Sequence, residues 1–195
     1  MTKNLVLVGG GGHCLSCIDV IEQTKQFRIV GILDVTNKVG SRVSDYPVLG
    51  TDENIEEHIN KDCAFIVTIG QIRSVEARLR IFSRLKKSGA LLPTIISPRS
   101  YVSRFAELGQ GTIIMHDVIV NANATVGENC IINTKAIIEH GANVGDHCHI
   151  STAAVINGDC VVSSKSFVGS NAVCVEGTFL KEESFVKAGS LYRSS

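Results

Sequence analysis

The chain has 195 residues, with 19 basic and 19 acidic side chains and a hydrophobic fraction of 44%. This length supports one large domain or two small domains, each with its own core. The formal net charge is zero, and Lys and Arg are scattered along the chain, so no basic surface is available for nucleic acid or for an anionic membrane. We therefore expect no nucleic-acid partner and no membrane partner.

The first residues, MTKNLVLVGGGGH, contain only four consecutive aliphatic residues before the glycines. This run is too short for a signal-peptide core or a membrane span, which predicts a cytoplasmic protein. The seven cysteines are an odd number in a chain that shows no export signal. We interpret them as reduced thiols rather than as a disulfide framework.

The first half of the chain alternates strand-like and helix-like patterns. Strands are predicted at LVLV (5–8), FRIVGILD (27–34), CAFIVTIG (63–70) and ALLPTIIS (90–97). A helix with Leu15, Ile18 and Ile21 at helical spacing follows the first strand, and a basic helix is predicted over 74–88. This βα alternation predicts an α/β domain with a small parallel, Rossmann-like sheet over residues 1–97.

The glycine run at 9–12 opens the first predicted helix, where backbone N–H groups and the positive helix end favour a phosphate. The spacing does not complete the dinucleotide fingerprint, because Cys14 stands where a third glycine is needed. A tight turn without a ligand is the alternative interpretation. Asp34, at the end of the second predicted strand, is either a ligand contact or an ordinary strand-end acid.

The second half carries a repeat of six residues that never shifts its register. Every sixth residue from Val102 to Val186 is aliphatic, with Cys174 as the single exception, and the residues two positions earlier are small. This period fits a prism-shaped parallel β-solenoid over residues 98–195, with three short strands in each coil of eighteen residues. Gly or Asn often follows the aliphatic residue, which predicts positive φ at the corners there. These residues are Gly109, Asn121, Gly127, Asn133, Gly145, Asn157 and Gly169.

This repeat resembles that of the hexapeptide-repeat acyltransferases, whose solenoid is a left-handed parallel β-helix. Together with GGGGHCLSCIDV, GILD and VTIGQIR in the first half, the chain resembles the PglD-like and NeuD-like sugar acetyltransferases from end to end. The resemblance implies an acetyl-CoA cosubstrate, a UDP-linked amino sugar in the first domain, and a homotrimer with clefts between subunits. The substrate-binding residues that it implies are Gly10, Gly11, Gly12, His13, Asp34 and Arg73.

The stretch IIEHGANVGDHCHIST (137–152) holds three histidines. Residues eighteen apart stack one strand spacing apart, about 4.8 Å, so Gly158 is predicted directly above His140. An imidazole beside an approachable glycine N–H pairs a base for the nucleophile with a donor for a tetrahedral oxyanion. His149 lies nine residues from His140, half a coil away, so we expect residues from different faces to meet at a cleft between subunits.

The family pattern N-T-x-x-x-I-E-H followed by H-[VI]-S matches Asn133, Thr134, Ile138, Glu139, His140, His149 and Ser151. By resemblance, His140 is the general base, His149 and Ser151 lie on the acetyl-CoA side, Asn133 supports the sugar site, and the Gly158 amide lies at the thioester oxygen. The family's glutamate after the histidine is Gly141 here. The orienting carboxylate is then either missing or supplied by Glu139 or Asp117.

A zinc site at His147, Cys148 and His149 is not expected, because alternate strand residues point to opposite faces. We expect no metal cofactor. The sequence therefore predicts an acetyl-CoA-dependent N-acetyltransferase for the 4-amino group of a UDP-linked 4-amino-4,6-dideoxy sugar in surface-glycan biosynthesis. The alternatives are O-acetylation of sialic acid or a related surface sugar and, outside enzymes, a solenoid scaffold or binding module.

Overall fold

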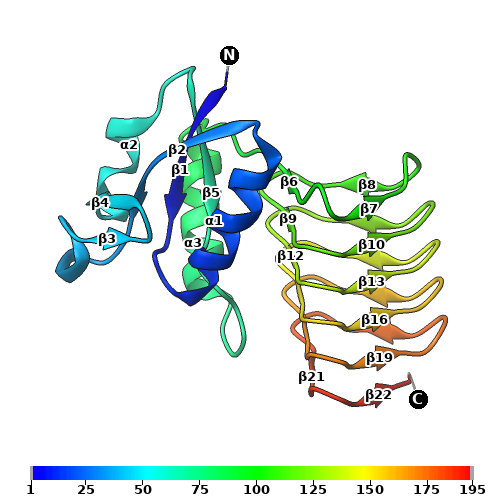
Figure 1. Cartoon of the computed structure of the whole chain (residues 1–195). Coiled ribbons are helices and arrows are strands. Elements are labelled where there is room, and N and C mark those ends of the chain that lie inside the picture. Colours follow the sequence, from blue (N-terminus) through cyan, green and yellow to red (C-terminus); the bar gives the residue numbers. More distant parts are fainter. Residues whose placement is uncertain (1, 194–195) are drawn as a thin grey trace. The chain divides into compact units, whose positions relative to one another are not determined.

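The computed structural model describes residues 2–193, which form two compact units that divide between Pro93 and Thr94. The first unit is an α/β domain and the second is a parallel β-solenoid (Figure 1). Within residues 2–193, no helix has both the length and the apolar composition to cross a membrane.

The first unit contains a five-stranded sheet in the order β3-β4-β2-β1-β5. Strands β1 (Lys3–Val8), β2 (Phe27–Leu33), β4 (Tyr46–Gly50) and β5 (Cys63–Val67) are parallel, and β3 (Arg42–Val43) is an antiparallel edge strand. The helices are α1 (Gly12–Thr24), α2 (Ile55–His58) and α3 (Glu76–Lys87), with 3₁₀ turns η1 (Thr36–Lys38) and η2 (Asp52–Asn54). The predicted small parallel sheet is therefore confirmed.

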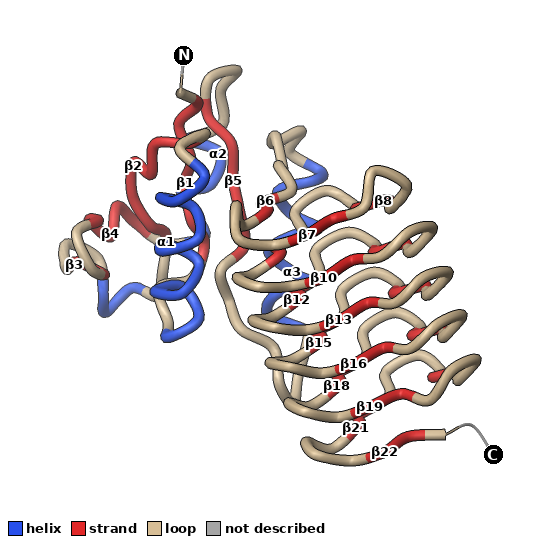
Figure 2. Tube along the Cα trace, turned by 45° about the vertical axis from the view of Figure 1, so that its right-hand side comes forward, coloured by secondary structure: helices blue, strands red, loops and turns tan. Residues whose placement is uncertain are grey.

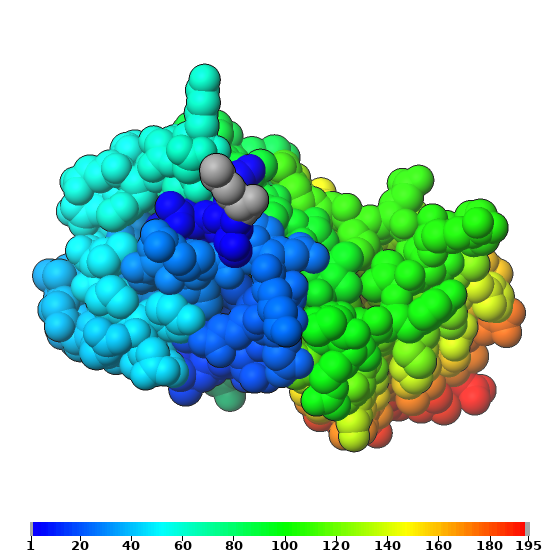
Figure 3. All heavy atoms as spheres, turned by 45° about the horizontal axis from the view of Figure 1, so that its top comes forward, coloured from blue at the N-terminus to red at the C-terminus, as the bar shows by residue number. Residues whose placement is uncertain are grey.

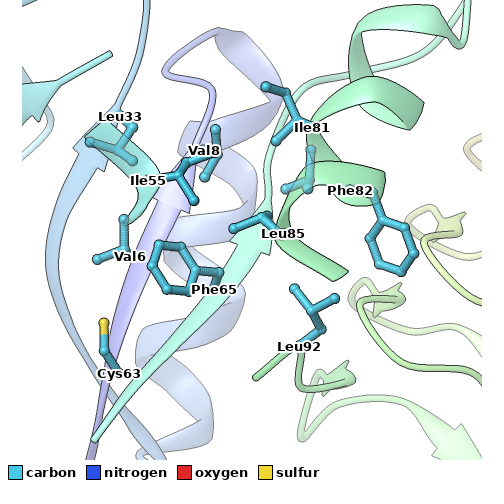
Figure 4. Packing of buried hydrophobic residues seen from close by; sticks show 11 residues of the cluster. Val6, Val8, Leu33, Ile55, Cys63, Phe65, Ile81, Phe82, Leu85 and Leu92 are labelled. Atoms are coloured by element: carbon cyan, nitrogen blue, oxygen red, sulfur yellow. The ribbon is translucent and has the colours of Figure 1, made fainter. Parts of the chain in front are cut away.

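The core of this unit forms where α3 covers β1 and β5 (Figure 4). Its members come from almost continuous apolar strands, as expected when both faces of a parallel sheet are covered. They are Val6, Val8, Leu33, Ile55, Cys63, Phe65, Val67, Ile81, Phe82, Leu85 and Leu92.

The buried stripe of α1 differs from the predicted one at one position. Leu15 is 51% exposed, whereas Cys14 and Cys17 are fully buried beside Ile18 and Ile21. Residues 14, 17, 18 and 21 follow the i, i+3, i+4, i+7 spacing of one helix face, and residue 15 lies outside it. The two cysteines are therefore packing residues of this helix.

The segment 90–97 is not the single strand that the sequence predicted. Leu91 forms an isolated parallel bridge with Ala64 of β5, and β6 (Ile95–Ile96) pairs with β9 (Ile113–Ile114) in the solenoid. The compact units accordingly divide between Pro93 and Thr94, before the expected boundary at residue 97. Pro93 interrupts the run because it has no N–H to donate to a strand ladder.

The solenoid of the second unit is a left-handed parallel β-helix with three strands in each coil (Figure 2). Each strand of its three sheets has two residues, and we name each sheet by its first strand. The β6 face contains β6, β9, β12 (Ile131–Ile132), β15 (His149–Ile150), β18 (Phe167–Val168) and β21 (Phe185–Val186). The β7 face contains β7 (Tyr101–Val102), β10 (Ile119–Val120), β13 (Ile137–Ile138), β16 (Val155–Ile156), β19 (Val173–Cys174) and β22 (Leu191–Tyr192). The β8 face contains β8 (Glu107–Leu108), β11 (Thr125–Val126), β14 (Asn143–Val144), β17 (Val161–Val162) and β20 (Phe179–Leu180).

Both predicted columns line the interior of the solenoid. Val120, Ile138 and Ile156 are fully buried, as are the small residues Ala136 and Cys148. Strands pair with the strands eighteen residues away throughout, so the register is constant from coil to coil. In the space-filling view, successive coils follow one another from green to red (Figure 3).

The corners differ from the prediction in a regular way. From Leu108 onward, positive φ occurs three residues after each inward residue rather than directly after it, for example at Asn129, Gly141 and Asp159. The glycines that directly follow an inward residue have another purpose. A Cβ on Gly145 would lie 2.7 Å from the backbone nitrogen of Ser164 in the next coil, so these glycines allow close stacking of coils.

Candidate functional site

His140 and Gly158 stack at one corner of the solenoid, as predicted. His140 lies two residues beyond Ile138 of β13, which pairs with Ile156 of β16. A Cβ placed on Gly158 would lie 2.8 Å from Cε1 and 3.1 Å from Nε2 of His140, so only glycine leaves room for the ring in this position. The His140 side chain is otherwise exposed to solvent. The corner therefore presents an accessible base against a bare stretch of backbone.

The backbone of Gly158 has one group engaged and one group available. Its carbonyl accepts a hydrogen bond from the Gly177 N–H at 2.9 Å. Its own N–H donates to no acceptor within the described residues 2–193. An unpaired backbone donor beside an imidazole is the arrangement that stabilises a developing oxyanion while the base takes a proton.

The two carboxylates considered as partners of His140 are both held elsewhere. Glu139 Oε2 accepts a hydrogen bond from Asn121 Nδ2 at 2.7 Å, on the preceding coil. Asp117 forms a bidentate ion pair with Arg99, at 2.8 Å between Nη2 and Oδ2, at a different corner. Neither carboxylate therefore replaces the glutamate that the resembling family has at the position of Gly141.

Asn133, His149 and Ser151 form a second cluster, at the junction of the β6 and β7 faces. Asn133 Oδ1 accepts the Thr134 N–H at 2.8 Å, which orients Nδ2 toward His149 Nε2 at 3.3 Å. His149 is only 6% exposed and makes an edge contact with Phe167, at 5.2 Å between ring centroids. Because Asn133 donates to Nε2, the proton of a neutral His149 resides on Nδ1.

Ser151 is also buried, and its hydroxyl lies 2.9 Å from the hydroxyl of Ser170. The cluster therefore belongs to one edge of the β7 face, and the His140 corner belongs to the other edge. Within a single chain, His149 and His140 therefore lie apart. This agrees with the half coil that separates them in the sequence.

The glycine turn of the first unit lies between β1 and α1. Gly9 has a φ of 109°, and its carbonyl accepts a hydrogen bond from Thr68 Oγ1 at 2.6 Å. Helix α1 begins at Gly12, and no side chain caps its N-terminus at Gly11. A Cβ on Gly11 or Gly12 would have no heavy atom within 4 Å, so this end of the helix is open. The N–H groups of Gly11 and Gly12 can receive an anionic oxygen there.

Asp34 lies directly beside this turn. A Cβ on Gly10 would lie 2.5 Å from Asp34 Oδ2, so Gly10 is required for the approach of the two segments. Lys38 donates to Asp34 Oδ2 at 2.7 Å and to the Gly10 carbonyl at 3.4 Å. Sequence reasoning did not include Lys38, although its i, i+4 spacing from Asp34 is the signal that could have found it.

His13 lies on the first turn of α1, and its Nε2 is 3.3 Å from the Sγ atom of Cys17. Burial raises the pKa of the Cys17 thiol well above its usual range, and burial likewise raises the pKa of Cys14 to about 11. Both thiols are therefore protonated. Arg73 is exposed on the loop after β5.

Two of the remaining histidines, His116 and His147, have side-chain partners. Ser97 Oγ lies 2.7 Å from His116 Nδ1, and Asn129 Nδ2 lies 3.0 Å from His147 Nδ1. Across residues 2–193, no group of three or more His, Cys, Asp or Glu side chains is arranged to hold a metal ion. All seven cysteines are free and buried, which agrees with the prediction of reduced thiols.

An open groove of about 390 Å³ lies on the β8 face. Glu107, Thr125 and Asn143 line it from the strands, and Gly127 and Gly145 line it from the corner. None of the predicted site residues lines this groove.

The chain is similar to known proteins in both of its units. The PglD N-terminal domain family matches residues 4–85. A UDP-N-acetylbacillosamine N-acetyltransferase of Bacillus subtilis (strain 168) is 31% identical over 115 residues, which are 58% of this chain and 51% of that protein. The match thus spans about half the length of this curated relative.

Two solved structures align with nearly the whole chain. PerB from Caulobacter crescentus, in complex with CoA and GDP-perosamine, is 26% identical with a TM-score of 0.89, and the alignment covers 99% of this chain and 90% of that one. The acetyltransferase domain of PglB from Neisseria gonorrhoeae FA1090, in complex with acetyl coenzyme A, is 23% identical with a TM-score of 0.88, covering 98% and 91% of the two chains. Residues 4–85 thus match the PglD N-terminal domain family, and nearly the whole chain shares the fold of these solved acetyltransferases.

Proposed function

We propose that the chain is an acetyl-CoA-dependent N-acetyltransferase that acts on the 4-amino group of a UDP-linked 4-amino-4,6-dideoxy sugar. The observation that carries this proposal is the stack of His140 on Gly158, which pairs an exposed imidazole with an available backbone N–H. Its support from relatives is that one acetylates a UDP-linked amino sugar and another was crystallised with CoA and GDP-perosamine.

The proposed reaction is a direct attack without an acyl-enzyme. The neutral amine attacks the thioester carbonyl, a C–N bond forms, and His140 takes the proton that the amine loses. The Gly158 N–H stabilises the oxyanion of the tetrahedral intermediate. The C–S bond then breaks, and the thiolate of CoA leaves and takes up a proton. A cysteine nucleophile has no support, because all seven thiols are buried.

The nucleotide sugar is proposed to bind at the open N-terminus of α1. There the N–H groups of Gly11 and Gly12 suit a diphosphate, whose negative charge interacts favourably with the positive helix end. Asp34 and Lys38 lie at the edge of the same turn, where a carboxylate suits nucleoside hydroxyl or amide donors. Arg73 is proposed as a further contact to the substrate.

The active unit is proposed to be a homotrimer that packs through its β7 faces. The outward residues of this face are apolar on every strand, and three of them are 37–61% exposed in the single chain, which is unusual for a monomer surface. They are Tyr101, Ile119, Ile137, Val155, Val173 and Leu191.

The β7 face separates the two halves of the proposed site. The corner with His140 follows β13 along one edge, and Asn133 precedes β13 along the other edge. Cyclic packing through these faces is heterologous, so one chain's His140 corner meets the next chain's cluster of Asn133, His149 and Ser151. In this arrangement His149 and Ser151 serve acetyl-CoA, and Asn133 serves the sugar.

The test is a turnover panel that follows CoA release from acetyl-CoA. The acceptors are a UDP-linked 4-amino-4,6-dideoxy sugar, its GDP-linked counterpart and a sialic acid, with His140→Gln as the matched inactive control. The proposal expects fastest turnover of the UDP-linked amine and loss of turnover in the control. Turnover of the sialic acid alone would instead establish O-acetylation, and no turnover of any acceptor would remove the enzyme assignment.

A further inference from the structure

The residue after His140 marks the main departure from the family pattern. Gly141 stands where the pattern has glutamate, and its φ is +68°, in the left-handed region. A Cβ built on Gly141 would collide with Oδ1 of Asp159. The carboxylate of Asp159 therefore occupies the space that a side chain at position 141 would enter.

Asp159 reaches this place from the next coil. It directly follows Gly158, against which the His140 ring packs, and its N–H donates to the His140 carbonyl at 3.1 Å. His140 thus stacks on Gly158, and Gly141 stacks on Asp159. The imidazole and the carboxylate therefore belong to neighbouring positions of two stacked corners. The φ of Asp159 is +57°, and Asp is among the few residues that adopt this conformation without a large penalty.

Four successive coils carry only negative charges at this edge of the solenoid, whereas Arg104 lies at the edge in an earlier coil and Arg193 in a later one. The edge contains residues 121–123, 139–141, 157–159 and 175–177 of four successive coils, with Glu139, Asp159 and Glu176 as its carboxylates. Glu139 is hydrogen-bonded to Asn121 on the preceding coil, and Glu176 lies one coil beyond Gly158. Asp159 is the carboxylate that fills the space above Gly141.

We propose that Asp159 is a positioning residue that replaces the missing glutamate, stabilising the imidazolium form of His140 after it takes the proton of the attacking amine. This inference rests on the proposed function of His140 as the base. A carboxylate near the ring that is not hydrogen-bonded to it acts through its charge, because an opposite charge nearby favours the protonated ring. Its loss weakens His140 as a base without removing the base itself.

The first test is the steady-state kinetics of Asp159→Asn with the UDP-linked amine. Asn keeps the shape of the side chain and tolerates the positive φ, so the corner should fold normally. We expect kcat to fall roughly tenfold while the KM values for both substrates stay unchanged, because the carboxylate stabilises the ring only after it has taken the proton. Glu183→Gln is the matched control, since Glu183 occupies the same position of the repeat, with φ +59°, at another corner.

The second test moves the carboxylate back to position 141. The double variant Gly141→Asp/Asp159→Gly places aspartate at 141 and removes the side chain with which it would collide. Recovery of most of kcat, relative to Asp159→Gly alone, would support the exchange of roles. An unchanged kcat in Asp159→Asn, with normal wild-type turnover, would overturn this inference alone, whereas absence of wild-type turnover would instead refute the proposed function.

Discussion

The contact between Gly158 and His140 gives a prediction whose size follows from the structure. In Gly158→Ala the new Cβ would lie 2.8 Å from Cε1 of His140, so the ring must withdraw by about 0.6 Å to reach an ordinary contact of 3.4 Å. The ring is the end of an exposed side chain and can withdraw without moving the backbone. Because misplacing a catalytic group by about 1 Å can cost on the order of 100-fold in rate, we expect turnover to fall between roughly 10-fold and 100-fold.

The fold of Gly158→Ala should be preserved. A matched substitution at another glycine separates this loss of activity from a loss of stability. In Gly145→Ala the new Cβ would lie 2.7 Å from a backbone nitrogen of the next coil, which cannot withdraw, so about 1–3 kcal/mol of stability should be lost. Thermal unfolding by circular dichroism and CoA release are measured for both variants. If Gly158→Ala turned over at the wild-type rate, the reasoning would be refuted, because catalysis would then not depend on the position of the His140 imidazole against residue 158.

Four further predictions follow from other contacts. His140→Ala should lower turnover by roughly 100-fold or more, while calorimetry shows unchanged affinity for UDP; undiminished turnover would exclude it as the base. Asn133→Ala removes the donor to Nε2 of His149 and should raise the KM for acetyl-CoA about tenfold, and an unaltered KM would separate His149 from the coenzyme. Ile137→Lys places a charge on the β7 face and should give monomers in light scattering where the wild type gives trimers; a trimeric variant would move the interface elsewhere. Since burial raises the pKa of Cys14 to about 11, the unfolded chain ionises first, so the melting temperature should fall as pH rises from about 9 to 11, and less steeply in Cys14→Ala.

The solenoid could be predicted from the sequence because its period is enforced at every coil. The interior accepts one aliphatic and one small residue per strand, so both columns are visible in the sequence, and the pairing of β10, β13 and β16 at eighteen-residue spacing follows directly. The stack of Gly158 on His140 could be predicted for the same reason.

The corner conformations could not be predicted from residue type alone. Lys135 and Ala153 adopt positive φ, although neither type favours it, because the coil geometry imposes that conformation at the third residue after each inward residue from Leu108 onward. Asn133 follows an inward residue without needing positive φ and instead joins His149 through its side chain.

Contacts between segments outside the repeat could also not be predicted from the sequence. The pattern of 90–97 is that of one apolar strand, and only tertiary pairing assigns Leu91 to β5 and β6 to the solenoid. Lys38 joins Asp34 and Gly10 only once the turn has folded. Asp159 is an ordinary polar corner residue in the sequence, and its place above Gly141 appears only when two coils are stacked.

The central claim is that the acetyl group passes to an amine of a nucleotide-linked sugar. The most direct measurement is carbon NMR of the product after incubation with acetyl-CoA labelled with ¹³C at the acetyl carbonyl and equal amounts of the UDP-linked 4-amino sugar and a sialic acid. We predict a single labelled amide whose carbonyl couples to the proton at C4 of the amino sugar through nitrogen, with one CoA released for each amide. A labelled ester on the sialic acid, with the amino sugar unchanged, would contradict the account.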